Sequence, residues 1–279
     1  MLSEITPVIL TYNEAPNIER TLAKVTWARD IVMVDSGSTD ETLAIANRYS
    51  SVQVVHREFD SFASQCNFGL TQVRTDWVLS LDADYVLTDE LIAEIRALRP
   101  ADSTSAYFVR FKYCVDGQQL RGAAYPPRRV LYRRNEANYE NDGHAHHVRV
   151  TGETRQLSSF ILHDDRKSFD HWLRSQKLYA KLETQKLRGT RWRELEWPDR
   201  IRKLRVVAPI AMPLYCLFVK GGILDGRAGL YYAYQRMLAE LTLSRSLFEN
   251  GRRPRGIADC ELRIADCEGA KREEQSAKR

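Results

Sequence analysis

Short apolar runs alternate with helix-like periodic stretches over the first hundred residues. The runs predict strands at 6–12, 30–34, 52–55 and 76–81. The stretches between and after them predict a helix that begins at 13–16 and further helices at 40–49, 61–73 and 88–98, with Ser38 and Glu41 at capping-box spacing before the second one. Strands that alternate with helices imply right-handed crossovers, so we expect an α/β fold whose sheet is mostly parallel and carries helices on both faces.

The pattern changes after residue 100. Strands are predicted at 106–115, 130–133 and 158–162, and long helices at 169–188 and 228–248. We therefore expect an α/β domain over 1–165, with halves at 1–100 and 101–165. A helical region over 166–250 and a polar tail over 251–279 would follow it.

Composition places the chain among globular proteins, because 43% of its 279 residues are hydrophobic and 28% are charged. The five cysteines include no Cys-x-x-Cys pair, so neither a disulfide framework nor a zinc site is indicated. The N-terminus has no basic segment followed by a long apolar one, as a secretion signal would. These features predict a protein of a reducing, cytoplasmic compartment.

Two carboxylates one residue apart, Asp82 and Asp84, follow the predicted strand 76–81. The carboxyl ends of strands in open α/β sheets are where ligands bind, and paired aspartates there can share Mg²⁺ or Mn²⁺, which in turn can hold a diphosphate. A solvated strand-to-helix turn would also favour Asp at these positions. Asp-x-Asp alone does not decide between the two readings.

Two further loops strengthen the ligand hypothesis. Residues 11–14 and 35–40 follow the first two predicted strands, so a parallel sheet brings them to one cleft with Asp82 and Asp84. Carboxylates and hydroxyls suit a base and a ribose, and a metal suits the phosphates. Neither a Gly-x-Gly-x-x-Gly motif after the first strand nor a P-loop is present, which argues against dinucleotide redox chemistry and P-loop phosphoryl transfer.

Four motifs in this order resemble the family 2 glycosyltransferases, which have the GT-A fold. They are Leu-Thr-Tyr-Asn-Glu at 10–14, Val-Asp-Ser-Gly-Ser-Thr-Asp at 34–40, Asn-Phe-Gly at 67–69 and Leu-Asp-Ala-Asp at 81–84. Asn-Asp-Gly-His at 141–144, Ile-Leu-His at 161–163 and a glycine-rich segment at 220–226 are similar to the bacterial lipopolysaccharide-core β-1,4-glucosyltransferase branch. The resemblance thus extends over about residues 5–250, and its second half is the less specific part.

The resemblance implies roles for individual residues. Asp35 would contact the base of a nucleotide-sugar donor, Asp82 would lie near the ribose and the metal, and Asp84 would ligate the metal, Mn²⁺ or Mg²⁺. The remaining donor-binding residues would be Thr11, Asn13, Glu14 and Asn67. Many relatives carry Arg or Lys before the asparagine of Asn-Phe-Gly, whereas this chain has Cys66, so a cation for the donor phosphates would come from Arg57 or Arg129 or be absent.

Sugar transfer also needs a base that removes the proton of the acceptor hydroxyl. Asp142 is our candidate, because Gly143 gives its loop backbone freedom and the segment follows the nucleotide-binding half. Glu140 is the reserve. A histidine metal cluster at 144–147 is disfavoured, since hard cations prefer oxygen and adjacent strand residues point to opposite faces. His163 is either a further metal or phosphate contact or a hydrogen-bonded loop histidine.

Charge is divided unevenly between the two parts of the chain. Residues 1–150 hold 16 Lys and Arg against 20 Asp and Glu, whereas residues 151–279 hold 26 against 17. Basic residues and tryptophans at 192–205 precede the 14-residue uncharged run 206–219, as in an interfacial helix on an anionic membrane. Alternatively, residues 206–224 pack on the α/β domain or on a second subunit. Nucleic acid is disfavoured, because an acidic cleft repels phosphate.

These observations predict a metal-dependent inverting glycosyltransferase at the inner face of the cytoplasmic membrane. Its donor would be a nucleoside-diphosphate sugar, with UDP-glucose the first choice, and its acceptor a lipid-linked or lipopolysaccharide-type glycan. A nucleotidyltransferase on a similar core and a catalytically silent membrane adaptor are the alternatives. The sequence names neither the sugar nor the oligomeric state.

Overall fold

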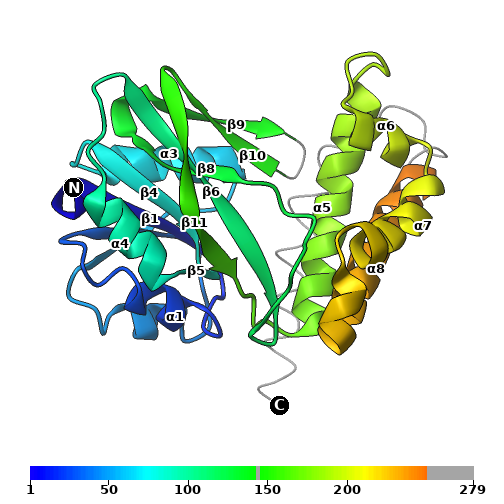
Figure 1. Cartoon of the computed structure of the whole chain (residues 1–279), viewed down its shortest axis with the longest axis horizontal. Coiled ribbons are helices and arrows are strands. Elements are labelled where there is room, and N and C mark those ends of the chain that lie inside the picture. The colour runs from blue at the N-terminus through cyan, green and yellow to red at the C-terminus, as the bar shows by residue number, and fades with distance from the viewer. Residues whose placement is uncertain (143–144, 250–279) are drawn as a thin grey trace.

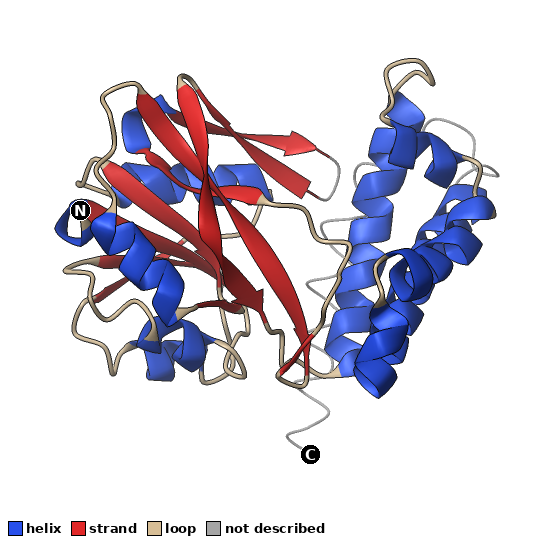
Figure 2. Cartoon of the chain, in the orientation of Figure 1, coloured by secondary structure: helices blue, strands red, loops and turns tan. Residues whose placement is uncertain are grey.

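Within residues 1–142 and 145–249, which the computed structural model describes, nine strands form one twisted sheet and two form a separate hairpin. Helices cover the sheet, and helices α5 to α8 lie along one side of it (Figure 1, Figure 2). We call the segment from α5 to α8, residues 169–249, the helical arm. The mixed α/β architecture predicted from the sequence is confirmed.

The first half of the sheet is parallel, as predicted. Its strands are β3 (Val52–His56), β2 (Ile31–Asp35), β1 (Ile5–Thr11) and β4 (Trp77–Asp82), side by side in that order. The register pairs Thr11 with Asp35 and Leu10 with Asp82. The carboxyl ends of β1, β2 and β4 therefore meet at one edge.

The second half of the sheet adds antiparallel strands. The order continues from β4 through β8 (Arg128–Arg133), β6 (Thr104–Val115) and β11 (Glu153–His163) to β5 (Tyr85–Leu87), and β7 (Gln118–Gln119) pairs with β6. Strand β8 is antiparallel to both of its neighbours, whereas β6 and β11 are parallel to each other. Strands β6 and β11 consequently end at the same edge as β1, β2 and β4.

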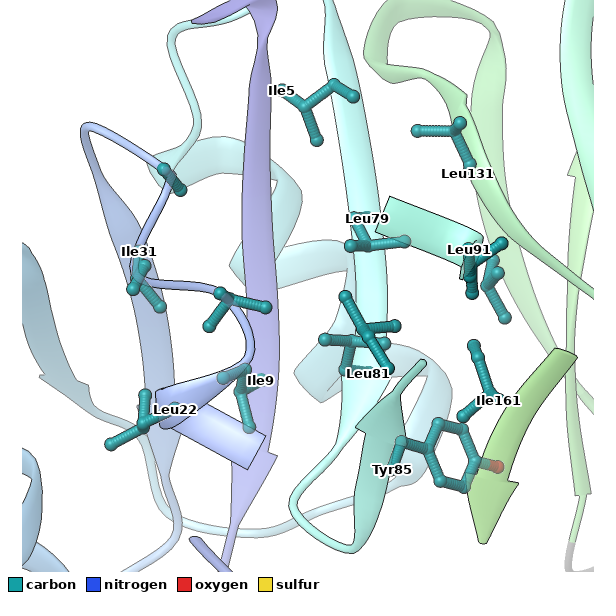
Figure 3. Close-up of a cluster of buried hydrophobic side chains, with 14 of the residues drawn as sticks. Ile5, Ile9, Leu22, Ile31, Leu79, Leu81, Tyr85, Leu91, Leu131 and Ile161 are labelled. Atoms are coloured by element: carbon teal, nitrogen blue, oxygen red, sulfur yellow. The ribbon is translucent and has the colours of Figure 1, made fainter. Parts of the chain in front are cut away.

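Alternate strand residues build a core on each face of the sheet. One face packs against α1 (Ile18–Ala23), α2 (Thr42–Ala46) and α4 (Asp89–Ala97), and Figure 3 shows this cluster around Ile9, Leu79 and Leu81. The other face, which includes Val8 and Val34, packs against α3 (Phe62–Gln72) and the hairpin of β9 (Ala137–Asp142) and β10 (Ala145–Val150). Short 3₁₀ turns cover Leu2–Glu4 and Arg134–Glu136. The hairpin occupies the polar, histidine-rich segment between the predicted strands 130–133 and 158–162.

Two predicted helix starts are wrong, for related reasons. The first helix begins at Ile18 instead of 13–16, because Asn13 adopts φ +53° and its side-chain oxygen accepts a hydrogen bond from the Thr39 N–H at 2.8 Å. The second begins at Thr42 without a capping box, because the Ser38 hydroxyl oxygen accepts the N–H of Asn13 at 2.9 Å while the hydroxyl donates to Asp35. In both places a polar side chain holds a loop of the cleft rather than a helix end.

The helical arm comprises α5 (Phe169–Gly189), α6 (Trp197–Lys203), α7 (Val207–Leu214), a π-helical turn (Tyr215–Val219), a 3₁₀ turn (Gly222–Asp225) and α8 (Gly226–Glu249). An apolar cluster joins its helices, made of Ala180, Leu187, Leu195, Leu243 and Leu247. Buried ions add to it, with Arg202 3.0 Å from Glu240 and Lys186 2.9 Å from Asp199. The backbone N–H of Arg121 donates to Asp225 at 2.9 Å and so ties the arm to the segment after β7.

In the described part of the chain, no single helix is long and apolar enough to cross a membrane. Val207–Val219 and Gly222–Glu249 meet the length and hydropathy criterion only as a pair, and the pair is bent by 71°.

Glycine at position 69, in the Asn-Phe-Gly motif, lets α3 approach the sheet closely. A Cβ at this position would lie 2.7 Å from Cγ1 of Val8 and 3.3 Å from Cγ2 of Val34. Overpacking of this kind costs about 1–3 kcal/mol, against a gain in helix propensity of about 1 kcal/mol. We expect Gly69→Ala to lower the free energy of unfolding by up to about 2 kcal/mol in urea denaturation.

The matched control for this substitution is Gly189→Ala at the end of α5, where a Cβ meets no atom within 4 Å. It should leave the free energy of unfolding unchanged or raise it slightly. Equal effects of the two substitutions would contradict the packing role of Gly69.

Candidate active site

The loops after β1, β2 and β4 meet at the carboxyl edge of the sheet, as the sequence predicted. Asp35 organises the loop between β2 and α2, where it is buried and accepts hydrogen bonds from the N–H groups of Gly37 and Ser38 at 2.8 and 2.9 Å. Thr11 donates its hydroxyl to Asp35 at 3.1 Å, and the N–H of Asn13 donates to the Ser38 hydroxyl at 2.9 Å. Thr11, Asn13 and Asp35 thus form one hydrogen-bonded unit, and their contact with a donor stays a prediction.

Asp84 lies between β4 and β5 and pairs with a histidine from the other half of the sheet. Its Oδ2 is 3.1 Å from Nε2 of His163, the last residue of β11, and the side chains are 13% and 15% exposed. Burial raises the pKa of Asp84, but the attraction of His163 and its hydrogen bond outweigh burial and hold that pKa at about 2. In turn, Asp84 raises the pKa of His163 against the effect of burial. The pair therefore places an ionised carboxylate at the edge of the sheet.

A second ion pair, between Lys167 and Glu14, lies near the first one. The Lys167 ammonium lies 2.6 Å from Oε1 of Glu14, and Asn17 donates to Oε2 of the same carboxyl at 2.9 Å. Burial raises the pKa of Glu14 to about 7, against the opposing attraction of Lys167. The charge of Glu14 raises the pKa of Lys167, against burial. Lys167 thus links the segment after β11 to the loop after β1.

Arg128 supplies a half-buried cation near Asp82. The guanidinium lies 5.0 Å from the ring centroid of Tyr125, and the negative charge of Asp82 helps to raise the pKa of Arg128 above its usual range despite burial. Strand β8 runs antiparallel to β4, so its first residue, Arg128, lies toward the carboxyl end of β4. Arg128 therefore adds a cation to this edge of the sheet, in addition to Lys167.

Of the two arginines proposed from the sequence, Arg57 lies at the edge of the site, because its N–H donates to the carbonyl of Asp35 at 2.9 Å. The Arg57 guanidinium pairs with Asp60 at 2.8 Å, and the Arg129 guanidinium stacks over the ring of Phe108 at 4.6 Å. Strand residues alternate between faces, so Arg129 points away from the face to which Arg128 points.

The helical arm brings Tyr179 of α5 to the same cleft. Burial raises the pKa of Tyr179 to about 12, and the carboxylates of Asp82, Asp84 and Glu14 add to that rise while Lys167 opposes it. The ring also contacts Phe62 of α3, with 6.4 Å between centroids. No sequence motif pointed to Tyr179, because its position depends on how the arm packs against the sheet.

Asn67 has a structural role in this arrangement. Its amide donates to the carbonyl of Tyr139 at 3.0 Å and accepts from the N–H of Tyr139 at 2.9 Å, so both ends hold β9. Its predicted contact with a donor finds no support in this geometry. Asn141 similarly fixes the end of β9 to the start of α3, since its Oδ1 accepts from the N–H of Ala63 at 3.2 Å.

The predicted base falls at the tip of the β9–β10 hairpin. Asp142 is the last residue of β9, but its side chain lies outside the described residues, as do Gly143 and His144. The reserve candidate Glu140 pairs on the exposed hairpin surface with Arg149 at 2.5 Å. An ion pair of this kind makes Glu140 the weaker candidate for a base.

The residues at the edge of the sheet fit a divalent cation of the Mg²⁺ or Mn²⁺ type. Asp84 is ionised, Asp82 lies two residues away, and Nδ1 of His163 is buried without a hydrogen-bond partner among the described residues. Over the same residues, no three His, Cys, Asp or Glu side chains form a ready metal centre. Such cations are commonly held by one or two carboxylates together with substrate phosphates, so this donor set is sufficient only with a phosphate ligand.

Comparison with known proteins gives a family match for the first half of the chain. The model of the glycosyl transferase family 2 matches residues 6–152, a range that includes Thr11, Asp35, Asp82 and Asp84.

Individual relatives match over shorter regions. An uncharacterized glycosyltransferase of Rickettsia bellii is 34% identical over 108 residues, which cover 38% of this chain and 36% of the relative. The lipopolysaccharide core biosynthesis glycosyltransferase LpsC of Rhizobium meliloti is 29% identical over 134 residues, or 46% of this chain and 47% of that protein. The chain thus spans less than half the length of these two relatives.

A solved structure extends the likeness to most of the chain. The mannosyltransferase PcManGT of Pyrobaculum calidifontis, in complex with GDP-Man and Mn²⁺, superposes with a TM-score of 0.52 at 16% identity. The superposition covers 90% of this chain and 88% of that one. At this identity the likeness shows the shared GT-A fold.

The buried pair of Glu14 and Lys167 predicts a pH-dependent loss of stability. In Lys167→Met the Glu14 carboxyl loses its cation, so its pKa in the folded state rises further above the ordinary value of 4.5. A raised carboxyl pKa favours folding at low pH, and this contribution is lost as pH rises through the folded pKa. We expect the substitution to cost about 3 kcal/mol of unfolding free energy at pH 8 and much less at pH 5.

Lys24→Met is the control for this measurement, which uses urea titrations at both pH values. Lys24 pairs with Asp89 at a similar 2.7 Å, but the Asp89 side chain is 81% exposed, so the loss should stay below about 1 kcal/mol at either pH. An equal, pH-independent loss of unfolding free energy in both variants would show that burial does not determine how the Glu14 pair contributes to stability.

Proposed function

The chain belongs to glycosyl transferase family 2, and on that basis we propose that it transfers a sugar from a nucleoside-diphosphate sugar to a hydroxyl group of a glycan, with inversion at the anomeric carbon. The observation that carries the proposal is the meeting of three strand-end loops around Asp82 and Asp84, inside the range that matches the family. Carboxylates, a half-buried cation and hydroxyl groups then lie at one edge of the sheet, and these groups suit a nucleotide and its phosphates.

The donor end of the cleft would hold the diphosphate. Asp82 and Asp84, with His163 beside Asp84, would hold a divalent cation, which acts as a Lewis acid and neutralises the charge of the leaving diphosphate. Arg128 adds a fixed positive charge next to Asp82. Asp35 and Thr11 remain our candidates for the nucleoside, and UDP-glucose is the donor we propose from the resemblance of the motifs.

The acceptor hydroxyl would be activated by Asp142. The acceptor oxygen forms a bond to the anomeric carbon while the bond from that carbon to the diphosphate oxygen breaks, and the hydroxyl proton passes to the Asp142 carboxylate. A single displacement of this type inverts the anomeric centre, so an α-linked donor gives a β-linked product. The nucleoside diphosphate leaves with the electron pair of the broken bond.

The acceptor we propose is a lipid-linked or lipopolysaccharide-type glycan. The name of the relative LpsC refers to lipopolysaccharide core biosynthesis, and segments 141–144, 161–163 and 220–226 support the same branch. Such acceptors are anchored in a membrane, so the enzyme would work at the inner face of the cytoplasmic membrane.

Neighbouring arginines allow a sharp test of the donor site. Arg128 is half-buried near Asp82, whereas the Arg129 guanidinium stacks on Phe108. We expect Arg128→Ala to weaken UDP binding about tenfold or more, since hydrogen bonds to charged groups contribute about 1.5–3 kcal/mol. Arg129→Ala should change it less than about twofold, and calorimetric titration with UDP measures both. The reverse order of effects would remove Arg128 from the donor site.

The reaction itself is tested by its products and by its base. With UDP-glucose, Mn²⁺ and a glycolipid extract, the protein should release UDP, whereas release of diphosphate would identify a nucleotidyltransferase. Asp142→Asn should slow sugar transfer by about 10²-fold or more while UDP-glucose still binds. Glu140→Gln, the same change two residues away, should leave most of the activity. Normal transfer by Asp142→Asn would move the base to another residue.

A further inference from the structure

Exposed apolar side chains are concentrated on the helical arm. Among the described residues, 21 large hydrophobic side chains are exposed, and 17 of these lie between residues 192 and 248. Scattered exposed hydrophobic residues are normal, but a contiguous apolar patch marks an interaction site. The arm therefore presents a surface that the sheet domain does not cover.

Helix α7 carries the most regular part of this surface. One side of α7 carries Val207, Ile210 and Leu214, and Phe218 of the π-helical turn after α7 continues this spacing of three or four residues. In that order these side chains are 41%, 66%, 50% and 63% exposed. The opposite side packs on α8 through Cys216, which is 1% exposed. Figure 1 places α7 on the side of the arm away from the sheet.

The stripe continues around the corner between α7 and α8. Val219 follows Phe218 directly in the π-helical turn, and Leu224 lies in the 3₁₀ turn after it. Their side chains are 72% and 66% exposed. We call the six residues Val207, Ile210, Leu214, Phe218, Val219 and Leu224 the α7 ridge. The backbone bends here by 71°, so the ridge ends in an apolar corner instead of extending into α8.

The exposed charges within the ridge segment of the chain all have the same sign. Between residues 204 and 234, all of which the structure describes, the exposed charged side chains are those of Arg205, Lys220 and Arg227. The acidic residue of this segment, Asp225, is 3% exposed and lies 3.4 Å from Arg121. An apolar ridge with cations at both ends thus faces solvent.

We propose that the α7 ridge is a membrane-docking surface that lies in the interface of an anionic bilayer. An interfacial helix buries its apolar side at the level of the acyl chains while its basic residues meet lipid phosphates, and the ridge has both features. In a symmetric dimer through this surface, Arg205 and Lys220 would meet cations of the second copy, whereas an anionic bilayer supplies the opposite charge. The proposal goes beyond sugar transfer and does not depend on it.

Tryptophans at the start of the arm agree with this assignment. Trp197, at the beginning of α6, is 71% exposed, and Trp192 is 46% exposed. Tryptophan favours the boundary between headgroups and acyl chains, because its ring is apolar and its N–H is polar. Helix α6 leads directly into α7, so both tryptophans lie close in the chain to the ridge.

Vesicle flotation with the full chain tests the proposal. We expect the protein to float with vesicles of phosphatidylethanolamine and phosphatidylglycerol and not with vesicles of phosphatidylcholine alone. Ile210→Glu combined with Phe218→Glu should lower the partition coefficient about 100-fold or more, since burial of each side chain contributes about tenfold. Arg205→Gln combined with Lys220→Gln should lower it about 25-fold, or fivefold for each cation.

The matched control combines Leu178→Glu with Phe59→Glu. These residues are 43% and 41% exposed and lie outside the ridge, so the chain gains the same two charges and should still float with anionic vesicles. Circular dichroism checks that every variant folds. Donor binding is measured on the same proteins. If none of them binds the donor, the wild type included, the proposed function is contradicted, whereas the flotation result still stands.

Three results would overturn the assignment. The wild-type chain would fail to float with anionic vesicles, or the Ile210 and Phe218 variant would float as well as the wild type does. In the third, the wild type would be a dimer in sedimentation analysis and the same variant a monomer, which would show that a second copy covers the ridge.

Discussion

The ion pair between Asp84 and His163 is the interaction on which the site depends. It joins the end of β4, in the parallel half of the sheet, to the end of β11, in the second half. The segment that follows His163 then reaches α1, where Asp164 pairs with Arg20 at 2.6 Å and Lys167 pairs with Glu14. Buried charges need partners, so these pairs fix the relative positions of the loops that form the cleft.

The strands, and the loops that meet at their ends, could be predicted from the sequence because they depend on local pattern. Apolar runs gave β1 to β4, and polar residues after them gave Thr11, Asp35, Asp82 and Asp84. The capping-box prediction for Ser38 failed, because its hydroxyl oxygen accepts the N–H of Asn13 instead of a helix N–H. A side chain that can cap a helix can also hold a loop, and tertiary contacts decide between the two.

Residues that reach the site from a distance were not predictable in the same way. No sequence motif marked Arg128, because its place depends on how β8 pairs with the rest of the sheet. Lys167 and Tyr179 had no such signal, because their positions depend on the course of the chain after β11 and on the packing of α5. The helical arm thus contributes Tyr179 to the site and, in our proposal, binds a membrane through the α7 ridge.

The central claim is that Asp84 and a divalent cation together bind a nucleotide-sugar, and the thermal midpoint of unfolding tests it most directly. A ligand at 100 times its Kd stabilises the folded state by about 2.7 kcal/mol. We expect UDP-glucose to raise the midpoint by several degrees with Mn²⁺ but not without it, and this rise should disappear in Asp84→Asn and persist in Asp89→Asn. A rise that is independent of Mn²⁺ and survives in Asp84→Asn, or no rise with any nucleotide-sugar, would contradict the account.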